Sequence, residues 1–469
     1  MNHLAIIRVF SMLTTALAAC LALGAFVAWI VGDRLQLGVF LVTSIILMVM
    51  AGTVLFLTDA SERRTSPNDG LAIAVLIWIV LPLPAGIPFF SFMDEPRVLT
   101  AYYEAVSCLT TTGQSLITDA ENPLPTSLLV WRAVLHLLGA IAAITIAASI
   151  LSALNLGGPG IHRSYLFTIR EGDFFDSLPK VVRATTVLVI SSTLILSSLL
   201  LMLGASPRAA FSWSISAITT GLVDPTSTTY NPAMNPIQSA LIFVGLVFGT
   251  VGFVVTDHIV SRKWARAVSD PETVALVFAL GAVGILVFLA GVPIFQAMGW
   301  SLSSLATSGM ALSDSSRFQR IPLPLEILPV LIGGSALSAA GGIKLARLIV
   351  LSRRVGLEFI QLGYRGSVQK FRFRGQYQSE ETVAGVWVYL VGYIIAAVTG
   401  VLLLSVLGLP FEAAIRTAIG SLSNSGHIID GGVVDAGPLL QICAILGMLL
   451  GRLEVIALLP TLNPSFWRA

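Results

Sequence analysis

Charged residues are scarce in this chain. Lysine, arginine, aspartate and glutamate make up 11% of its 469 residues, roughly half the share that soluble domains carry. Hydrophobic residues, in contrast, make up 55% of the chain, and the mean hydropathy is +0.88. Several apolar runs reach the ~20 residues that a helix needs to cross a bilayer. The composition therefore excludes an ordinary soluble protein and predicts an integral membrane protein.

Cysteine and the familiar catalytic motifs are also missing or rare. The three cysteines, Cys20, Cys108 and Cys443, lie in apolar sequence without metal-ligand spacing, which predicts packed thiols rather than disulfides. There is no His-Glu-x-x-His, no paired aspartate motif and no triad-like set, so a membrane-embedded enzyme is disfavoured. Little chain remains between the apolar runs, and we expect any nucleotide-binding module to be on another polypeptide.

The apolar runs predict ten membrane-spanning helices. The first two follow each other closely and are expected to form a retained helical hairpin rather than a signal peptide. The expected spans are 4–31, 36–57, 71–92, 128–155, 183–204, 237–260, 272–291, 325–352, 383–408 and 436–460.

Four short polar tracts lie between the later spans, and each ends in a glycine that follows a hydroxyl residue. A proline stands 14 to 17 residues before each glycine, and an aspartate 3 to 6 residues after it. The stretch from proline to glycine is too short to cross a bilayer, so we expect a re-entrant half-helix there. The tract residues are Thr111, Thr112 and Gly113; Thr219, Thr220 and Gly221; Thr307, Ser308 and Gly309; and Asn424, Ser425 and Gly426. Four copies of one polar element predict a four-fold pore.

The tracts have the chemistry that a cation needs when it leaves water. Hard monovalent cations are matched by backbone carbonyls and hydroxyls, and glycine lets the backbone turn successive carbonyls toward an axis. Each half-helix would also direct the partial negative charge of its carboxyl end at its tract. We therefore predict a cation-selective filter with one glycine per tract. Its selectivity is expected to be looser than that of a two-glycine filter.

Basic residues set the predicted orientation. The loops after the second, fourth, sixth and eighth spans are rich in arginine and lysine, and the positive-inside rule places them in the cytoplasm. Both termini would then be cytoplasmic, and the tracts would enter the membrane from outside. Four aspartates would either line an outer vestibule that concentrates cations or lie as solvated loop residues. These are Asp119, Asp224, Asp314 and Asp430.

Two features on the inner side of the predicted filter are candidates for a gate. The eighth span is interrupted at 333–342 by small residues with glycine pairs at both ends, which predicts a movable intramembrane loop; close helix packing is the alternative. Arg452 in the last span is either an electrostatic barrier in the pore or a side chain that reaches the inner interface. The candidate gate residues are Gly333, Gly334, Gly341, Gly342, Lys344 and Arg452.

These motifs resemble the membrane subunits of the Trk, Ktr and HKT superfamily of potassium transporters, most closely the Trk type. The best local matches are 107–113, 216–221, 341–344 and 451–454, and the N-terminal hairpin favours Trk over the shorter Ktr subunits. The resemblance implies that the four glycines are filter residues, that 333–342 is the gating loop and that Arg452 is the pore arginine. Gln114 and His427, beside their glycines, depart from the family pattern. His427 would face the outer mouth, as a pH-sensitive group or an inert one.

The resemblance also implies K+ as the transported ion and a homodimer with one pseudo-tetrameric pore per subunit. A cytoplasmic nucleotide-binding subunit of the Trk A type would regulate it. The basic segment 353–374 is either its docking face or a solvated positive-inside loop. We expect a multi-pass protein of the plasma membrane, the bacterial inner membrane, with no covalent cofactor, no nucleic-acid partner and no enzymatic activity. Coupled symport with Na+ or H+, and a non-conducting sensor on the same fold, are the alternatives.

The expected fold class is thus an all-α integral membrane protein. It would consist of an N-terminal hairpin and four pseudo-symmetric repeats of helix, pore loop and helix around one pore. The expected boundaries are 1–57 for the hairpin, then 71–155, 183–260, 272–352 and 383–469 for the repeats.

Overall fold

A computed structural model of the chain is mainly helical throughout the residues that it describes. Seven helices in this part are long and apolar enough to cross a membrane, which confirms the prediction of an all-α, multi-pass membrane protein. The structure describes residues 2–58, 67–93, 97–117, 124–148, 174–225, 234–312, 321–364, 372–374, 376–377, 380–429, 437–453 and 463. The candidate spans are His3–Val31, Arg34–Leu57, Asn68–Phe90, Thr126–Ile146, Leu178–Met202, Pro271–Leu289 and Thr382–Val406.

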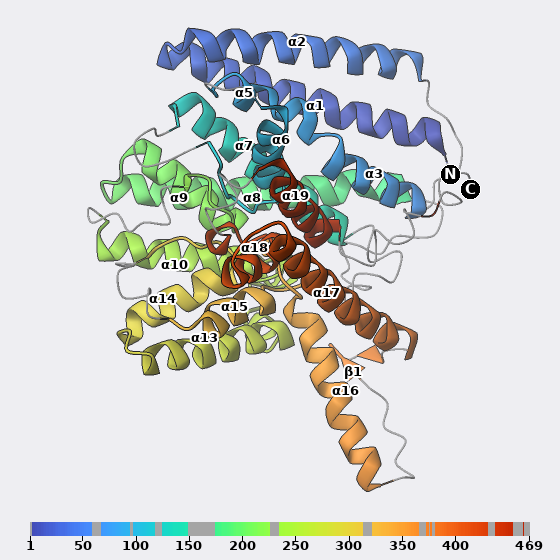
Figure 1. Ribbon diagram of the computed structural model, residues 1–469, viewed down its shortest axis with the longest axis vertical. Helices are drawn as coiled ribbons and strands as arrows, with labels where there is room; N and C mark the ends of the chain where they lie inside the picture. Colours follow the sequence, from blue (N-terminus) through green and yellow to red (C-terminus); the bar gives the residue numbers. More distant parts are fainter. Residues whose placement is uncertain are drawn as a thin grey trace.

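The N-terminal hairpin consists of α1 (His3–Val31) and α2 (Arg34–Leu57), which pack side by side along one edge of the molecule (Figure 1). Gly32 ends α1 because its φ of 81° places it in the left-handed region that glycine adopts without steric cost. Asp33 then caps α2, since its side chain accepts a hydrogen bond from Gln36 N. Two adjacent residues thus reverse the chain between two long helices.

The other helices form the body of the molecule, from which α16 projects (Figure 1). In chain order these helices and strands are α3 (Pro67–Ile79), α4 (Pro82–Ala85), α5 (Ile87–Phe90), α7 (Thr126–Ile146), α8 (Phe174–Met202), α10 (Pro236–Thr250), α11 (Phe253–Val260), α12 (Trp264–Val268), α13 (Pro271–Leu289), α15 (Leu323–Ile332), α16 (Leu345–Gly363), β1 (Arg372–Phe373), β2 (Gln376–Tyr377), α17 (Glu380–Val406) and α19 (Pro438–Leu453). The two strands form a small antiparallel hairpin between α16 and α17.

Four helices of 12 or 13 residues lie where the sequence predicts half-helices. At 1.5 Å per residue they are roughly 20 Å long, which is less than the ~30 Å of a bilayer's hydrocarbon core. Pro207 occupies the first turn of α9, where its missing N–H has no intrahelical partner in any case. The four are α6 (Val98–Leu109), α9 (Pro207–Thr219), α14 (Ile294–Leu305) and α18 (Phe411–Leu422).

Three of the expected spans are interrupted. The third, 71–92, divides into α3, α4 and α5. The eighth divides into α15 and α16, and the residues between them form the predicted intramembrane loop, hereafter the loop 333–342. The sixth was expected to be continuous but breaks between α10 and α11, because Thr250 O at the end of α10 accepts a hydrogen bond from Ser335 N of this loop (3.0 Å). Gly252 begins α11 in close contact with Ser335, since a Cβ there would lie 2.5 Å from the serine hydroxyl.

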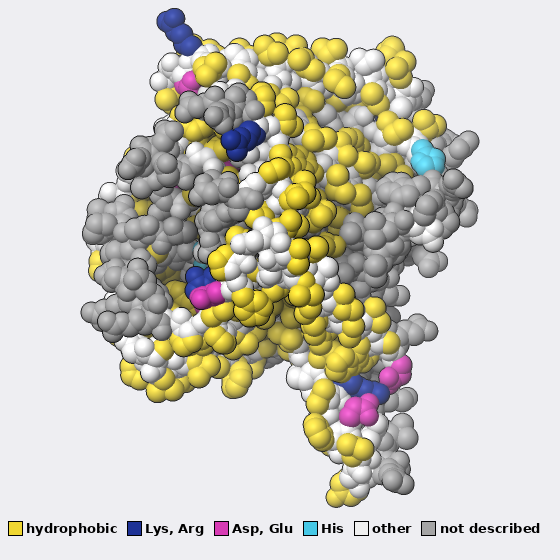
Figure 2. All heavy atoms as spheres, in the orientation of Figure 1, with side chains coloured by type: hydrophobic (Ala, Val, Ile, Leu, Met, Phe, Trp, Pro, Cys, Tyr) yellow, Lys and Arg dark blue, Asp and Glu magenta, His cyan; other side chains and the backbone are white. Residues whose placement is uncertain are grey.

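The outer surface of the described helices is largely apolar. Figure 2 shows hydrophobic side chains over most of the described face, with only small groups of charged ones. Phe56 on α2 is 90% exposed and Phe278 on α13 is 77% exposed, values that suit contact with lipid tails. Polar residues lie inside instead, around the ends of the four half-helices.

Candidate functional site: four buried tracts and the loop beside them

Each half-helix leads into a residue with positive φ. Four of the seven non-glycine residues with positive φ in the described part of the chain lie in the four tracts. This conformation is rare for residues that have a Cβ and costs on the order of 1–3 kcal/mol. The residues and their φ angles are Thr111 (54°), Thr220 (56°), Thr307 (56°) and Asn424 (51°). Because the same strained angle recurs at all four tracts, they share one backbone turn.

Side-chain hydrogen bonds fix the alignment of the first three tracts. In each, a serine of the half-helix bonds to the backbone of the residue seven positions later. The pairs are Ser107 with Gln114 O (2.6 Å), Ser216 with Val223 N (3.1 Å) and Ser303 with Met310 O (2.8 Å).

The second tract is offset by one residue from the alignment of the glycines. Gly113 and Gly309 stand two residues after the residue with positive φ, whereas Gly221 directly follows Thr220. Leu222 therefore occupies the place of the glycine in the second tract, and Gly221 occupies the place of Thr112. The sequence alone did not reveal this offset, because the glycine is the most visible feature of each tract.

The four tracts contact one another in cyclic order. The first and second tracts are in close contact: a Cβ added to Gly221 would lie only 2.3 Å from Thr111 O. The other contacts are hydrogen bonds: Ser308 Oγ to Ser216 O of the second half-helix (3.4 Å), Ser425 Oγ to Thr307 O (3.3 Å) and Gly426 N to Thr112 O (3.0 Å). The third tract thus contacts the second half-helix, the other neighbouring tracts contact one another directly, and the predicted tract residues lie together in one buried ring.

A buried ion pair joins the first two tracts at the residues where they end. Arg132 on α7 and Glu104 on α6 are both fully buried and lie 2.5 Å apart. The same guanidinium donates to Gly113 O (2.8 Å) and to Val223 O (2.9 Å). Glu104 also accepts hydrogen bonds from Ser115 Oγ and from the chain just after the first tract. The sequence prediction missed this pair, although two opposite charges in neighbouring apolar segments are a signal for it.

The loop 333–342 packs against the third and fourth tracts. Gly341 N donates to Thr307 Oγ1 (2.9 Å), and a Cβ on Gly341 would lie 1.7 Å from Ser423 O. Gly333 and Gly342, with φ of 70° and 79°, approach each other where the loop leaves α15 and rejoins the chain before α16. The Lys344 ammonium folds back onto the loop and donates to Ser338 O and Ala340 O. The predicted gate residues therefore lie together in one place.

Arg452 near the end of α19 reaches the first tract. Its Nε donates to Thr110 O (2.6 Å), and its guanidinium also bonds Thr111 Oγ1. Arg452 and Lys344 line the same cavity of about 30 Å³, with Gly341 and Tyr389 on its wall. This volume holds on the order of two water molecules, so a hydrated cation does not fit in this conformation.

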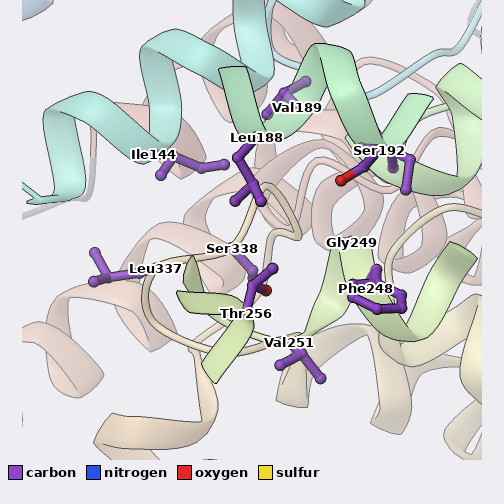
Figure 3. A pocket seen from close by; sticks show the side chains of 11 residues that line it. Ile144, Leu188, Val189, Ser192, Phe248, Gly249, Val251, Thr256, Leu337 and Ser338 are labelled. Atoms are coloured by element: carbon purple, nitrogen blue, oxygen red, sulfur yellow. The ribbon is translucent and has the colours of Figure 1, made fainter. Parts of the chain in front are cut away.

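A second cavity of about 30 Å³ lies on another side of the loop 333–342. Figure 3 shows Leu337 and Ser338 of the loop together with Leu188 of α8 and Thr256 of α11 around this space. The loop is thus flanked by small spaces on two sides, and Ser338 lines both of them.

The predicted outer residues are only partly described. Asp224 lies 3.9 Å from Arg208, and Asp119, Asp314 and Asp430 lie outside the described residues. His427 packs against the third tract, since a Cβ on Gly309 would lie 2.1 Å from the histidine Cβ. Its Nδ1 lies 3.0 Å from Ser425 Oγ, so the ring is part of the contact between the third and fourth tracts.

The fold and the buried ring define a multi-pass, all-α membrane protein with a polar centre, the class that includes channels and transporters. The TrkH family model, described as a cation transport protein, matches residues 37–327, well over half of the chain. The chain therefore belongs to the TrkH family of cation transport proteins, as its motifs predict.

Known relatives match over nearly their whole length. The Trk system potassium uptake protein TrkH of Vibrio parahaemolyticus is 26% identical, with 100% of both chains covered. The Trk system potassium uptake protein TrkI of Halomonas elongata is 25% identical, with 99% of this chain and 96% of the relative covered. The crystal structure of the potassium transporter TrkH from Vibrio parahaemolyticus has the same fold, with a TM-score of 0.86 over 100% of both chains at 24% identity.

Proposed function

We propose that this protein is the membrane subunit of a potassium uptake system and that K+ crosses the membrane through the ring of four tracts. The observation that carries the proposal is the cyclic contact of four tracts that share one strained backbone turn. Such a ring holds carbonyl and hydroxyl oxygens around a common centre, where they replace the water shell of a cation. The names of the relatives, which are potassium uptake proteins, point to the same ion.

The four half-helices contribute to cation binding through their orientation. Each runs into its tract with its carboxyl end, so four partial negative charges of about half an elementary charge are directed at the ring. The hydroxyls of Thr111, Thr112 and Ser425 are fully buried beside the tract backbones and hold the tracts in place through hydrogen bonds. In this proposal the predicted outer aspartates raise the local cation concentration, and residues 71–155, 183–260, 272–352 and 383–469 form four repeats around the pore.

The loop 333–342, Lys344 and Arg452 are proposed to form the gate. Lys344 and Arg452 line one small cavity next to the tracts, and two positive charges there oppose the passage of a cation. The pore conducts when the loop and these side chains move aside. The movement is proposed to be regulated by a Trk A type cytoplasmic nucleotide-binding subunit, in a homodimer with cytoplasmic termini.

Growth of a potassium-requiring bacterial host at limiting K+ tests the proposal. The native chain, expressed with its regulatory subunit, is expected to restore growth, and Gly113→Ser and Gly221→Ser are expected to weaken it because their side chains would collide with the neighbouring tract. Failure of the native chain to restore growth would contradict the uptake function and would favour a non-conducting sensor. Growth with both mutants at the native level would contradict the assignment of the filter.

A further inference from the structure

The loop 333–342 is held by a buried carboxylate that belongs to a different helix. Glu272 lies in the first turn of α13, and its side chain is 2% exposed. One of its oxygens accepts hydrogen bonds from the Ser335 hydroxyl and from Ala336 N (2.8 Å). A carboxylate that accepts two hydrogen bonds at the start of the loop fixes where the loop leaves α15.

The other oxygen of Glu272 is bound from the side opposite the loop. Arg374, just after β1, donates to it at 2.8 Å and to both oxygens of Asp270 at 2.9 Å. Burial by itself lowers the pKa of the Arg374 guanidinium, but the carboxylates of Glu272 and Asp270 more than offset this, and its pKa is raised. The guanidinium is therefore charged, and several hydrogen bonds to Glu272 and Asp270 set its position.

The hairpin of β1 and β2 also shares an apolar cluster with the loop. Phe373, adjacent to Arg374, is fully buried in the hydrophobic cluster that includes Leu337 and Ala339. At its far end the loop contacts the third tract through Gly341 N and Thr307 Oγ1. A continuous set of contacts thus runs from the hairpin through Arg374 and Glu272 to the loop, and from the loop to a tract.

We propose that Glu272 is the positioning residue of the loop 333–342 and that Arg374 couples this loop to the hairpin of β1 and β2. A partner that binds the basic segment 353–374 and displaces the hairpin of β1 and β2 would separate Arg374 from Glu272. Glu272 would then lose its counter-charge, and its hold on Ser335 and Ala336 would weaken. The inference deepens the proposed function, because it depends on this loop being the gate.

Two measurements on purified protein in liposomes test the coupling. The first is the rubidium flux without any regulatory subunit. The second is the rate at which a methanethiosulfonate reagent modifies a cysteine introduced by Ser338→Cys, in a background where Cys20, Cys108 and Cys443 are alanine. Ser338 is 4% exposed in the structure, so fast modification reports that the loop has left its place.

Glu272→Gln and Arg374→Gln are each expected to raise both the flux and the modification rate roughly 2- to 30-fold, as mutations within a coupled network do. Arg374→Lys keeps the charge and is expected to restore most of the native behaviour. Arg354→Gln is the matched control, since Arg354 pairs with Glu358 and Glu380 and is not among the residues that bind the loop. It is expected to leave both values unchanged.

The two readouts separate failure of this coupling from failure of the proposed function. If the native protein, Glu272→Gln and Arg374→Gln all conduct no rubidium, the proposed function fails, while the modification rate still reports whether Glu272 and Arg374 hold the loop. If Arg374→Gln and Glu272→Gln modify at the rate of Arg354→Gln, the coupling is wrong, whatever the flux. Size-exclusion chromatography identifies a variant that does not fold, and Ser335→Ala, which removes only one hydroxyl, then takes the place of Glu272→Gln.

Discussion

The buried pair of Arg132 and Glu104 offers the sharpest test of how the first two tracts are held. Replacing Arg132 by methionine leaves the Glu104 carboxylate buried without its counter-charge and removes the donors to Gly113 O and Val223 O. Removal of one partner from a buried ion pair costs about 3–5 kcal/mol. Glu104→Gln leaves the buried Arg132 guanidinium without its counter-charge, but its amide oxygen still accepts a hydrogen bond, so its cost is expected at the lower end of the same range, about 3 kcal/mol.

The double variant measures the interaction between Glu104 and Arg132 separately from the contacts that each makes with other groups. Glu104→Gln combined with Arg132→Met leaves no uncompensated charge, so its cost is expected to fall short of the sum of the single variants by about 1–3 kcal/mol. Glu412→Gln is the matched control: Glu412 also lies on a half-helix and pairs with Arg416, but its side chain is 64% exposed. An exposed pair of this kind contributes about 0.2–1 kcal/mol.

Reversible unfolding in mixed detergent micelles measures these free energies of unfolding. The uptake of rubidium in competition with K+ or Na+ measures whether the tracts still prefer K+ over Na+. Arg132→Met is expected to be the least stable single variant and to lose part of its preference for K+ over Na+. A cost for Arg132→Met no larger than that for Glu412→Gln, or single-variant costs that simply add, would refute the role of the pair.

Three further outcomes follow from the tracts. Gly426→Ala would place a Cβ 2.4 Å from Thr112 O and is expected to abolish rubidium uptake. Gly281→Ala is the control and is expected to leave uptake intact, because no atom lies within 4 Å of its added Cβ. Equal uptake by both variants would contradict the contact between the first and fourth tracts. Arg452→Gln is expected to raise rubidium flux severalfold because it removes a positive charge from the cavity beside the tracts, and an unchanged flux would exclude an electrostatic barrier. His427→Ala is expected to reduce rubidium uptake, because the ring packs against Gly309 and contacts Ser425 between the third and fourth tracts, and uptake at the native level would contradict a role for this contact.

Several parts of the structure could be predicted from the sequence because local chemistry determines them. Prolines mark the starts of half-helices, since a residue without an N–H suits a first helical turn, and the glycine pairs around 333–342 disfavour a continuous helix. The two closely spaced apolar runs at the start of the sequence predict the hairpin of α1 and α2. These features depend on residues that are close together along the chain.

Other parts depend on residues far apart in sequence and were missed. Glu104 pairs with Arg132, which lies 28 positions later on another helix. Glu272 pairs with Arg374, which lies 102 positions later in a short hairpin without a strong periodic pattern. The break after α10 exists because Thr250 bonds the loop 333–342, which is a tertiary contact. The offset in the second tract depends on backbone angles, which a count back from Gly221 does not reveal.

The most direct test of the ring of tracts as a filter uses the purified protein in liposomes. It compares how strongly K+ and Na+ each inhibit the uptake of rubidium, which measures the preference of the pore for K+ over Na+. Native protein and Gly281→Ser are expected to be inhibited by K+ far more than by Na+. Gly113→Ser, whose side chain would collide with the backbone of Leu222, is expected to lose most of that preference. A native protein without any preference, or a Gly113→Ser protein that keeps it in full, would contradict the filter.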